Sequence, residues 1–223
     1  MRGGTILIGG ADEAGRGCVI GPLVICLATV EKDREAELKK IGVKDSKLLT
    51  PKKREQLFGK ITSICNEFVV MKTTANSLNE EMKKYSLNEI EAMELGKALS
   101  LLKTPPEVVY IDSPDTIAKR FCTRIRKYHA GDEELICEHK ADFNYPICSA
   151  ASIIAKVERD AVIGEIKKEL GCDFGSGYTS DDRTIDFLKK NFRRAEIHKY
   201  IRQEWETINN LKQRKLSEFD ADE

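Results

Sequence analysis

After residue 86 the chain alternates short apolar segments with helical ones, and this order constrains its fold more than any other feature. Apolar segments at 107–111 and 134–139 are each followed by a helical pattern, the first running to about residue 128 and the second over 147–170. Strands separated by helical crossovers form parallel sheets, because a crossover returns the chain to the starting end of the sheet. We therefore predict an α/β protein with a parallel section of sheet.

The first third of the chain predicts an antiparallel addition to that sheet. Segments 5–9 and 23–30 are β-type and lie close enough together to pair directly, with the glycine-rich stretch 9–17 as the loop between them. Thr50 followed by Pro51 starts a helix, and Ser86 with Glu89 forms a capping box that starts another. The sheet is therefore expected to be mixed and covered by helices. In this part of the chain we expect a strand over 67–73 and helices over 51–65 and 86–102.

The C-terminal part has a weaker apolar pattern and an uneven charge. Residues 171–182 are expected to form a loop, and 184–191 and 194–211 to form helices. From Arg183 to Lys215 there are ten Lys and Arg against four acids, a net charge of +6, whereas the last eight residues are acidic. A basic section of this kind suits either phosphate binding or a solvated helix face. We predict a domain over 1–182 and a small helical appendage over 183–223 whose acidic tail is frayed.

Composition excludes several classes of protein. With 41% apolar residues in 223 the chain has ample material for a core, and 37 Lys and Arg balance 37 Asp and Glu. It has no apolar run of the roughly 20 residues that span a membrane, and acids interrupt the N-terminus before a signal peptide could form. A cytosolic protein without a membrane partner is expected. The seven cysteines are odd in number and form no C-x-x-C, which favours reduced thiols over a disulfide or zinc framework.

Four carboxylates stand at the ends of predicted strands: Asp12, Glu13, Asp112 and Asp142. Acids beside buried strands are costly unless they are paired, hydrogen-bonded or bound to cations. If they converge at one sheet edge they make a site for a hard cation such as Mg²⁺ or Mn²⁺. Taken singly, Asp112 or Asp142 is more typical of a turn or an N-cap than of a metal site. Neighbours on a strand point to opposite faces, so Asp12 and Glu13 share one site only if the glycine-rich backbone bends.

Other catalytic chemistries lack their motifs. The glycines near residue 15 have the wrong spacing for a dinucleotide fingerprint, and the segment after them is β-type rather than helical. Ser46 lies beside Lys47 but in no G-x-S-x-G elbow, and the three histidines lie in charged surroundings. The chain also contains no G-x-x-x-x-G-K-[ST] phosphate loop.

Several segments, taken in order, carry the motifs of one enzyme family and span most of the chain from about residue 6 to 182. They are 12–17, 19–24, 44–50, 110–113, 139–142, 149–160 and 175–181. Together they resemble ribonuclease HII, the type 2 ribonuclease H, and Trp205 is similar to a residue in the tail of archaeal members. Two positions depart from the family pattern, because Cys18 and Thr179 stand where proline is common. Neither is one of the four acids.

The resemblance implies a ribonuclease H-like fold with a five-stranded mixed sheet flanked by helices and a small helical C-terminal part. It implies an endoribonuclease that cuts the RNA strand of RNA–DNA hybrids and nicks duplex DNA 5′ to an embedded ribonucleotide. Asp12, Glu13, Asp112 and Asp142 are then the catalytic and metal-binding acids of a two-metal hydrolysis with Mg²⁺ or Mn²⁺. The products carry 5′-phosphate and 3′-hydroxyl ends, and a monomer is expected.

The same resemblance assigns substrate contacts. The backbone of Gly15, Arg16 and Gly17 is expected to contact the ribose 2′-hydroxyl, the group that distinguishes RNA from DNA. Tyr178 is expected to pack on the neighbouring sugar and Lys47 to contact phosphate. The weaker candidates for substrate binding are Ser46 and Ser149.

Two alternative functions follow from the same residues. A nucleic-acid-binding subunit could keep the fold without doing chemistry, although clustered acids would repel phosphate in such a protein. Another nuclease or a transposase of the same fold class would share the carboxylates but not the Gly-Arg-Gly segment together with Tyr178. Substrate choice distinguishes the last alternative from ribonuclease HII.

Overall fold

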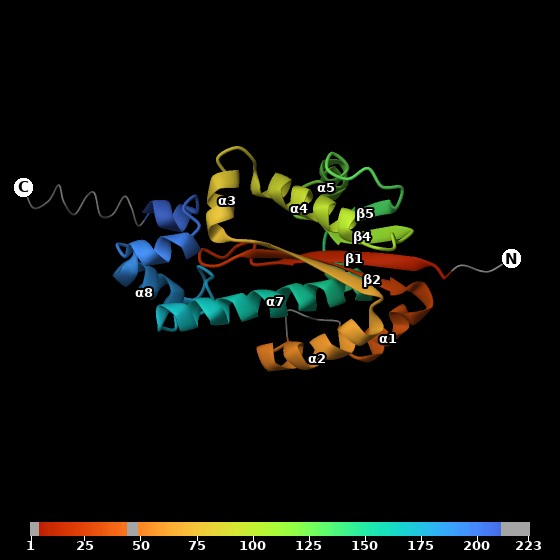
Figure 1. Ribbon diagram of the computed structural model, residues 1–223, viewed down its shortest axis with the longest axis horizontal. Coiled ribbons are helices and arrows are strands. Elements are labelled where there is room, and N and C mark those ends of the chain that lie inside the picture. Colours follow the sequence, from red (N-terminus) through yellow and green to blue (C-terminus); the bar gives the residue numbers. More distant parts are fainter. Residues whose placement is uncertain (1–4, 44–48, 211–223) are drawn as a thin grey trace, which may run out of the picture. The chain divides into compact units, whose positions relative to one another are not determined.

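The computed structural model describes residues 5–43 and 49–210, which form two compact units that interleave along the chain (Figure 1). The first unit contains the chain up to Ala14 together with Val24–Lys72 and Ser86–Glu158. The second contains Gly15–Leu23, Thr73–Tyr85 and the chain from Arg159 onward. The proposed division into a domain over 1–182 and an appendage over 183–223 stays a prediction, and the predicted acidic tail lies outside the described residues.

The first unit is built on a five-stranded sheet in the order β3-β2-β1-β4-β5. Strand β1 pairs antiparallel with β2 and parallel with β4, and β4 pairs parallel with β5. The predicted mixed sheet is therefore confirmed, with its parallel section in the later strands. The strands are β1 (Leu7–Ala14), β2 (Leu23–Glu31), β3 (Glu67–Thr73), β4 (Val108–Asp112) and β5 (Glu134–Glu138).

Helices cover both faces of this sheet because its central strands are apolar on both sides. Ala11 of β1 and Leu27 of β2 pack against α4 (Leu87–Leu101) and α5 (Ala118–Ile125). Ile8 and Cys26 of the same strands belong to the opposite core, which also contains residues of three further helices. These are α1 (Glu35–Lys40), which follows the short 3₁₀-helix η1 (Lys32–Arg34), α2 (Pro51–Ile64) and the N-terminal part of α7 (Pro146–Leu170).

The predicted capping residues start their helices. The Thr50 hydroxyl accepts a hydrogen bond from the Lys53 N–H at 3.3 Å, and Ser86 accepts one from the Glu89 N–H at the same distance. These bonds satisfy backbone donors that the first turn of a helix leaves unpaired. Within the described ranges no helix is long and apolar enough to cross a bilayer.

The second unit packs around the C-terminal part of α7 with α3 (Ala75–Glu81), α8 (Asp182–Asn191) and the 3₁₀-helix η3 (Ala195–Tyr200). The predicted helix over 194–211 is wrong in this region. Ile201 instead forms an antiparallel bridge with Ile20, and helical structure resumes only at residues 206–210 of the described chain. Pairing with a distant segment therefore overrides the local helical pattern here.

The predicted loop over 9–17 is also too long. Strand β1 continues to Ala14, which pairs with Val24 of β2, so Asp12 and Glu13 lie on a strand. The antiparallel ladder with β2 supplies hydrogen bonds that keep this glycine-rich segment extended. The turn begins only at Gly15, whose φ of 84° lies in the left-handed region that glycine tolerates.

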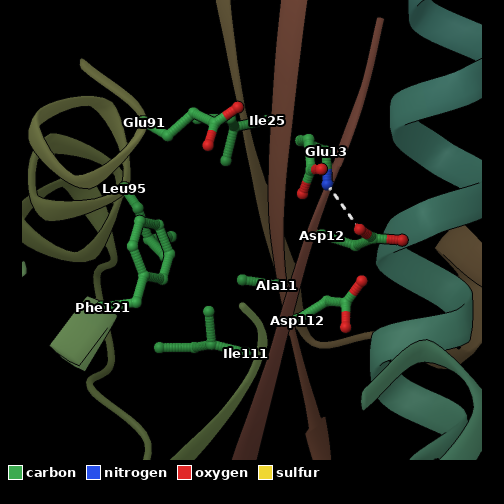
Figure 2. Close-up of a pocket in the computed structure, with 9 residues that line it drawn as sticks. All are labelled: Ala11, Asp12, Glu13, Ile25, Glu91, Leu95, Ile111, Asp112 and Phe121. Atoms are coloured by element: carbon green, nitrogen blue, oxygen red, sulfur yellow. Dashed lines mark hydrogen bonds between the residues drawn. The ribbon is translucent and has the colours of Figure 1, made fainter. Parts of the chain in front are cut away.

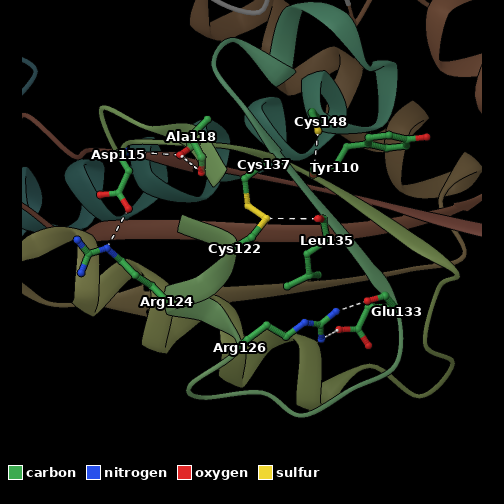
Figure 3. The surroundings of a disulfide bond; sticks show 11 residues. Tyr110, Asp115, Ala118, Cys122, Arg124, Arg126, Glu133, Leu135, Cys137 and Cys148 are labelled. Atoms are coloured by element: carbon green, nitrogen blue, oxygen red, sulfur yellow. Dashed lines mark hydrogen bonds and ion pairs between the residues drawn. A yellow bond between two sulfur atoms is a disulfide. The ribbon is translucent and has the colours of Figure 1, made fainter. Parts of the chain in front are cut away.

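A disulfide joins Cys122 of α5 to Cys137 of β5, so the expectation of reduced thiols is wrong for these two cysteines (Figure 3). The two residues are 15 positions apart and their Cα atoms lie 5.8 Å apart. The fold brings a helix and the following strand side by side, a proximity that cysteine number and spacing do not reveal. The other five cysteines are free.

Among the described glycines of the first unit, Gly10 of β1 allows the closest approach to backbone atoms. A Cβ atom at this position would lie 2.5 Å from the carbonyl carbon of Ile147 and 2.6 Å from the backbone nitrogen of Cys148. Both contacts are with the backbone of α7, which cannot give way as a flexible side chain can. The centre of the sheet therefore lies directly on the first turn of α7.

Gly10→Ala is expected to lower the free energy of unfolding by about 3 kcal/mol or more, because overpacking against backbone forces a strand or a helix to move. Chemical denaturation of the two proteins measures this difference. Gly59→Ala is the matched control, since Gly59 lies in α2 with no atom near its missing Cβ. That control should gain up to about 1 kcal/mol from helix propensity. A Gly10→Ala protein as stable as its parent would contradict the close contact.

Candidate active site

A pocket lies at the carboxyl ends of β1 and β4, where the pairing between the two strands stops (Figure 2). The two strands pair in parallel as far as Ala11 and Ile111, so the next residues in register are Asp12 and Asp112. Beyond this point β4 no longer covers the edge of β1. The carboxyl ends of parallel strands are a common place for ligands, and here three of the predicted acids line one pocket. The lining residues are Ala11, Asp12, Glu13, Ile25, Glu91, Leu95, Ile111, Asp112 and Phe121.

Asp12 points toward α7 and is buried (Figure 2). Its carboxylate accepts a hydrogen bond from the Glu13 N–H at 2.8 Å. Burial raises the pKa of Asp12 above its usual value, and the charge of Asp142 adds to this rise. The charge of Lys156 and a hydrogen bond from Ser152 lower the pKa, without cancelling the effect of burial.

Ser152 and Lys156 are two functional candidates that the sequence analysis missed. They stand four residues apart on α7, where helical spacing puts them on one face, and the Lys156 ammonium donates to the Ser152 hydroxyl. Both act on Asp12 through the hydrogen bond and the charge described above. The signal was present in the predicted helix over 147–170, but only the approach of β1 to α7 shows which strand this face meets.

Glu13 lies on the other face of β1, as the alternation of a strand requires. It lines the same pocket because the edge of β1 is uncovered there, so no bend in the backbone is needed. Glu91 of α4 also lines this pocket and is only 2% exposed, and it too was missed by the sequence analysis. An acid within an apolar helical stripe is not by itself a signal of a functional site.

Asp112 and Asp142 are brought together by the turn that follows β5. One carboxylate oxygen of Asp112 accepts a hydrogen bond from the Ala141 N–H at 3.0 Å. Lys140, with φ of 60° and ψ of 38°, adopts a left-handed conformation that starts the short helix α6 (Ala141–Asn144). Ser149 is buried and donates its hydroxyl hydrogen to the Asp142 carbonyl. This bond fixes the backbone of Asp142, and a substrate contact by Ser149 stays a prediction.

The donor set fits a hard divalent cation. Within residues 5–43 and 49–210, no three His, Cys, Asp or Glu side chains form a preformed metal cage. Three of the acids nevertheless lie near one buried group, the Cys148 thiol. Burial raises the pKa of this thiol well above its usual value, and the charges of Asp12, Asp112 and Asp142 raise it further. Buried carboxylates that repel one another are stabilised by a bound cation, and their oxygens suit Mg²⁺ or Mn²⁺.

The second unit holds the other predicted contact segment in a defined shape. The Gly15 N–H donates to the Tyr178 hydroxyl at 3.0 Å, and Cys18 forms an antiparallel bridge with Tyr178. The guanidinium of Arg159 lies 4.5 Å from the centre of the Tyr178 ring. Burial raises the pKa of Tyr178, so its hydroxyl stays protonated at neutral pH.

The remaining predicted contacts differ in how far the structure describes them. Gly17 is exposed and Arg16 is half-buried, next to the Gly15 turn. Ser46 and Lys47 lie outside the described residues.

Asp12→Asn is expected to raise the melting temperature at pH 7 in the presence of a chelator. The folded protein disfavours the ionised form of Asp12, so ionisation above the ordinary pKa of 3.8 costs stability that a neutral amide does not lose. Each kcal/mol of relief corresponds to about 2–4 °C for a chain of this size. A melting temperature at or below that of the parent would contradict this account.

Glu89→Gln is the control of opposite sign. Glu89 accepts hydrogen bonds from the Tyr128 hydroxyl and from Arg124, and these contacts, the Tyr128 bond first, lower its pKa to about 2. Its carboxylate therefore stabilises the fold above pH 4.5, and this contribution disappears as the pH falls toward 2. The Gln variant should melt lower than the parent at pH 7, and the difference should shrink in acid.

Comparison with known proteins places the chain in a family. The ribonuclease HII family model matches residues 9–208. Ribonuclease HII of Pyrococcus abyssi is 46% identical over 208 residues, covering 93% of this chain and 92% of that protein. The crystal structure of ribonuclease H2 from Pyrococcus horikoshii has a TM-score of 0.86 at 42% identity, covering 94% and 98%. Bst-RNase HIII in complex with Mn²⁺ shares the fold, with a TM-score of 0.77 at 19% identity. The match covers 95% of this chain and 71% of that one. The chain therefore belongs to the ribonuclease HII family and is a nuclease.

Proposed function

We propose that this protein hydrolyses the RNA strand of RNA–DNA hybrids and nicks duplex DNA on the 5′ side of embedded ribonucleotides. The observation that carries the proposal is the group of carboxylates around the ends of β1 and β4, in a chain that belongs to the ribonuclease HII family. Asp12, Glu13 and Asp112 line one pocket, and the turn after β5 joins Asp142 to them. The products would carry 5′-phosphate and 3′-hydroxyl ends.

The four acids would hold two divalent cations, Mg²⁺ or Mn²⁺. Such a pair supplies activation of the attacking water and stabilisation of the charge on the departing 3′ oxygen. Asp12 contributes a carboxylate that is already desolvated, and Ser152 and Lys156 favour its ionised form. The hydrogen bond from the Ala141 N–H orients the Asp112 carboxylate, which would serve as a ligand.

The segment Gly15-Arg16-Gly17 would recognise the ribonucleotide. A backbone turn can approach a ribose closely when it carries no side chain at two of three positions, and the 2′-hydroxyl offers both a donor and an acceptor to it. Tyr178 is bonded through its hydroxyl to the Gly15 N–H, so its ring would pack on the neighbouring sugar from a fixed position. Exposed cations of α8, Lys189 and Lys190, would add backbone contacts that weaken with salt.

A non-catalytic binding subunit is disfavoured by the energetics of the acids. The ionised Asp12 carboxylate, whose pKa is raised by burial, costs stability, and clustered acids repel a phosphate backbone unless cations offset their charge. A protein that only binds nucleic acid gains nothing in return for either cost. The match to the ribonuclease HII family also argues against a transposase or a nuclease of another family with the same fold.

Asp112→Asn is expected to reduce cleavage at least roughly a hundredfold, because a carboxylate ligand holds cations that supply several kcal/mol of charge stabilisation. The assay uses a labelled DNA duplex with one ribonucleotide, an all-DNA duplex as control, and Mg²⁺, Mn²⁺ or chelator. The parent should cut once, 5′ to the ribonucleotide and only with a cation. Asp132→Asn, an exposed acid outside the site, should cut like the parent.

Two results would argue against the proposal. Full activity of Asp112→Asn at every cation concentration would remove Asp112 from the site. A parent protein that binds the duplex but does not cut it with either cation would favour the binding subunit.

Tyr178→Ala is expected to lower kcat/KM for nicking at a single ribonucleotide by about 10- to 100-fold, since it removes both the ring and the acceptor of the Gly15 N–H. Gly15→Ala should act in the same direction, because its Cβ would lie 2.5 Å from the Pro22 carbonyl oxygen at a positive φ. Calorimetric titration with Mn²⁺ should give the parent affinity for both variants. Tyr85→Ala, an exposed tyrosine of the second unit, is the control. Nicking at the parent rate in Tyr178→Ala would disprove the assigned role.

A further inference from the structure

Arg202 is the largest fully buried side chain of the described residues. It follows η3 in the second unit, in the segment that the sequence predicted to be helical. Burying a guanidinium is expensive unless its donors are satisfied by hydrogen bonds. What this side chain contacts therefore indicates what it does.

Its guanidinium binds backbone at both ends of the turn that follows β1. Nε donates to the Gly21 carbonyl at 3.1 Å and Nη1 donates to the Arg16 carbonyl at 2.9 Å. These residues are 181 and 186 positions away in the sequence. The guanidinium carbon also lies 4.8 Å from the centre of the Trp205 ring, which supports the plane of the group from its own segment.

The backbone on either side of Arg202 pairs with the same turn. Its N–H donates to the Val19 carbonyl at 3.0 Å, and the Gly21 N–H donates to the Tyr200 carbonyl at 2.9 Å. Together with the bridge between Ile20 and Ile201, these bonds hold residues 19–21 against 200–202. The side chain of Arg202 then extends this contact to Arg16, which the backbone bonds do not reach.

Asn79 of α3 anchors this segment from its other side. Its amide nitrogen donates to the Ile201 carbonyl at 2.9 Å, and its amide oxygen accepts from the Gln203 N–H at 2.8 Å. Arg202 is thus held by its neighbours on both sides. Because this buried asparagine bonds the backbone on both sides of Arg202, it fixes the position of the Arg202 backbone relative to α3.

An arginine is the side chain that this geometry requires. Its planar fork presents donors in fixed directions and can reach two carbonyls at once, whereas lysine is a single point charge on a flexible stem. Replacing it with an apolar side chain would leave the Arg16 and Gly21 carbonyls without these donors.

We propose that Arg202 is a positioning residue that fixes the Gly15–Gly17 segment in the shape that recognises the ribonucleotide. The inference rests on the proposed function, in which that segment contacts the 2′-hydroxyl. Arg202 acts through the Arg16 carbonyl in the middle of the segment, whereas Tyr178 holds the preceding residue by accepting a hydrogen bond from the Gly15 N–H. Loss of this support leaves the acids in place but lets the turn move.

The experiment compares the parent with Arg202→Lys, using the full chain. Fluorescence anisotropy in EDTA, where no cation supports cleavage, gives the Kd of an all-DNA duplex and of the same duplex with one ribonucleotide. The ratio of the two Kd values measures recognition of the 2′-hydroxyl. We expect Arg202→Lys to reduce this ratio about tenfold, as the loss of a charged hydrogen bond implies. If the parent ratio is itself below about ten, the variant should bind both duplexes with the same Kd. Its affinity for Mn²⁺ should match that of the parent.

Arg126→Lys is the matched control. Arg126 belongs to the first unit and also donates to a backbone carbonyl, that of Gly131, at 2.7 Å, besides its ion pair with Glu133. It should lose thermal stability but keep the parent ratio. If the role of Arg202 is purely structural, Arg202→Lys should behave in the same way, with a lower melting temperature and an unchanged ratio of Kd values. This result would overturn the inference.

Failure of the proposed function gives a different result. A parent protein that neither nicks the ribonucleotide duplex nor distinguishes it from DNA overturns the recognition role of the turn, and the inference with it. A parent that discriminates, beside an Arg202→Lys protein that discriminates equally, overturns the inference alone. If Arg202→Lys does not fold, Asn79→Ala decides instead, because it loosens the segment that carries Arg202. A folded Asn79→Ala protein with the parent ratio overturns the inference, and a reduced ratio supports it.

Discussion

The contact between the β1 backbone and the first turn of α7 is the constraint on which the acid site depends. It exists because Gly10 has no side chain where a Cβ would meet Ile147 and Cys148. Two residues further along β1, Asp12 consequently faces Ser152 and Lys156 on the same helix. The segment just before α7 carries Ala141, which bonds Asp112, and Asp142. A single glycine thereby sets the distance between the strand and the helix from which the polar groups of the site project.

The acids conflict with the stability of the sheet that carries them. Burial at the end of β1 raises the pKa of Asp12, and the charge of Asp142 raises it further, so the ionised Asp12 carboxylate destabilises the folded protein at neutral pH. Ser152 and Lys156 offset part of this cost. An arrangement that opposes stability in this way is typical of a functional site rather than of a structural one. Glu89 provides the contrast, because three donors surround its carboxylate and lower its pKa to about 2.

Local patterns in the sequence predicted what local interactions determine. The strand over 67–73, the caps at Thr50 and Ser86 and the mixed sheet are all confirmed, because each depends on neighbouring residues or on the order of elements. The errors occur where distant segments meet. Pairing with β2 extends β1 into the glycine-rich stretch as far as Ala14, the disulfide joins two elements, and the bridge to Ile20 prevents a helix at Ile201. The partners of Ser152 and those of Arg202 become apparent only in the folded structure.

The two sets of proposed functional groups differ in what supplies their order. The acids lie near one another but form no preformed cage among the described residues, and in the proposed function bound cations would complete their arrangement. The turn at Gly15 is already fixed by bonds to Tyr178 and, at Arg16, to Arg202. Recognition of the sugar would therefore be built into the protein, whereas the chemistry would be assembled by the metal. This division would suit the proposed function, because a turn that is already fixed would recognise a ribose without changing its own shape.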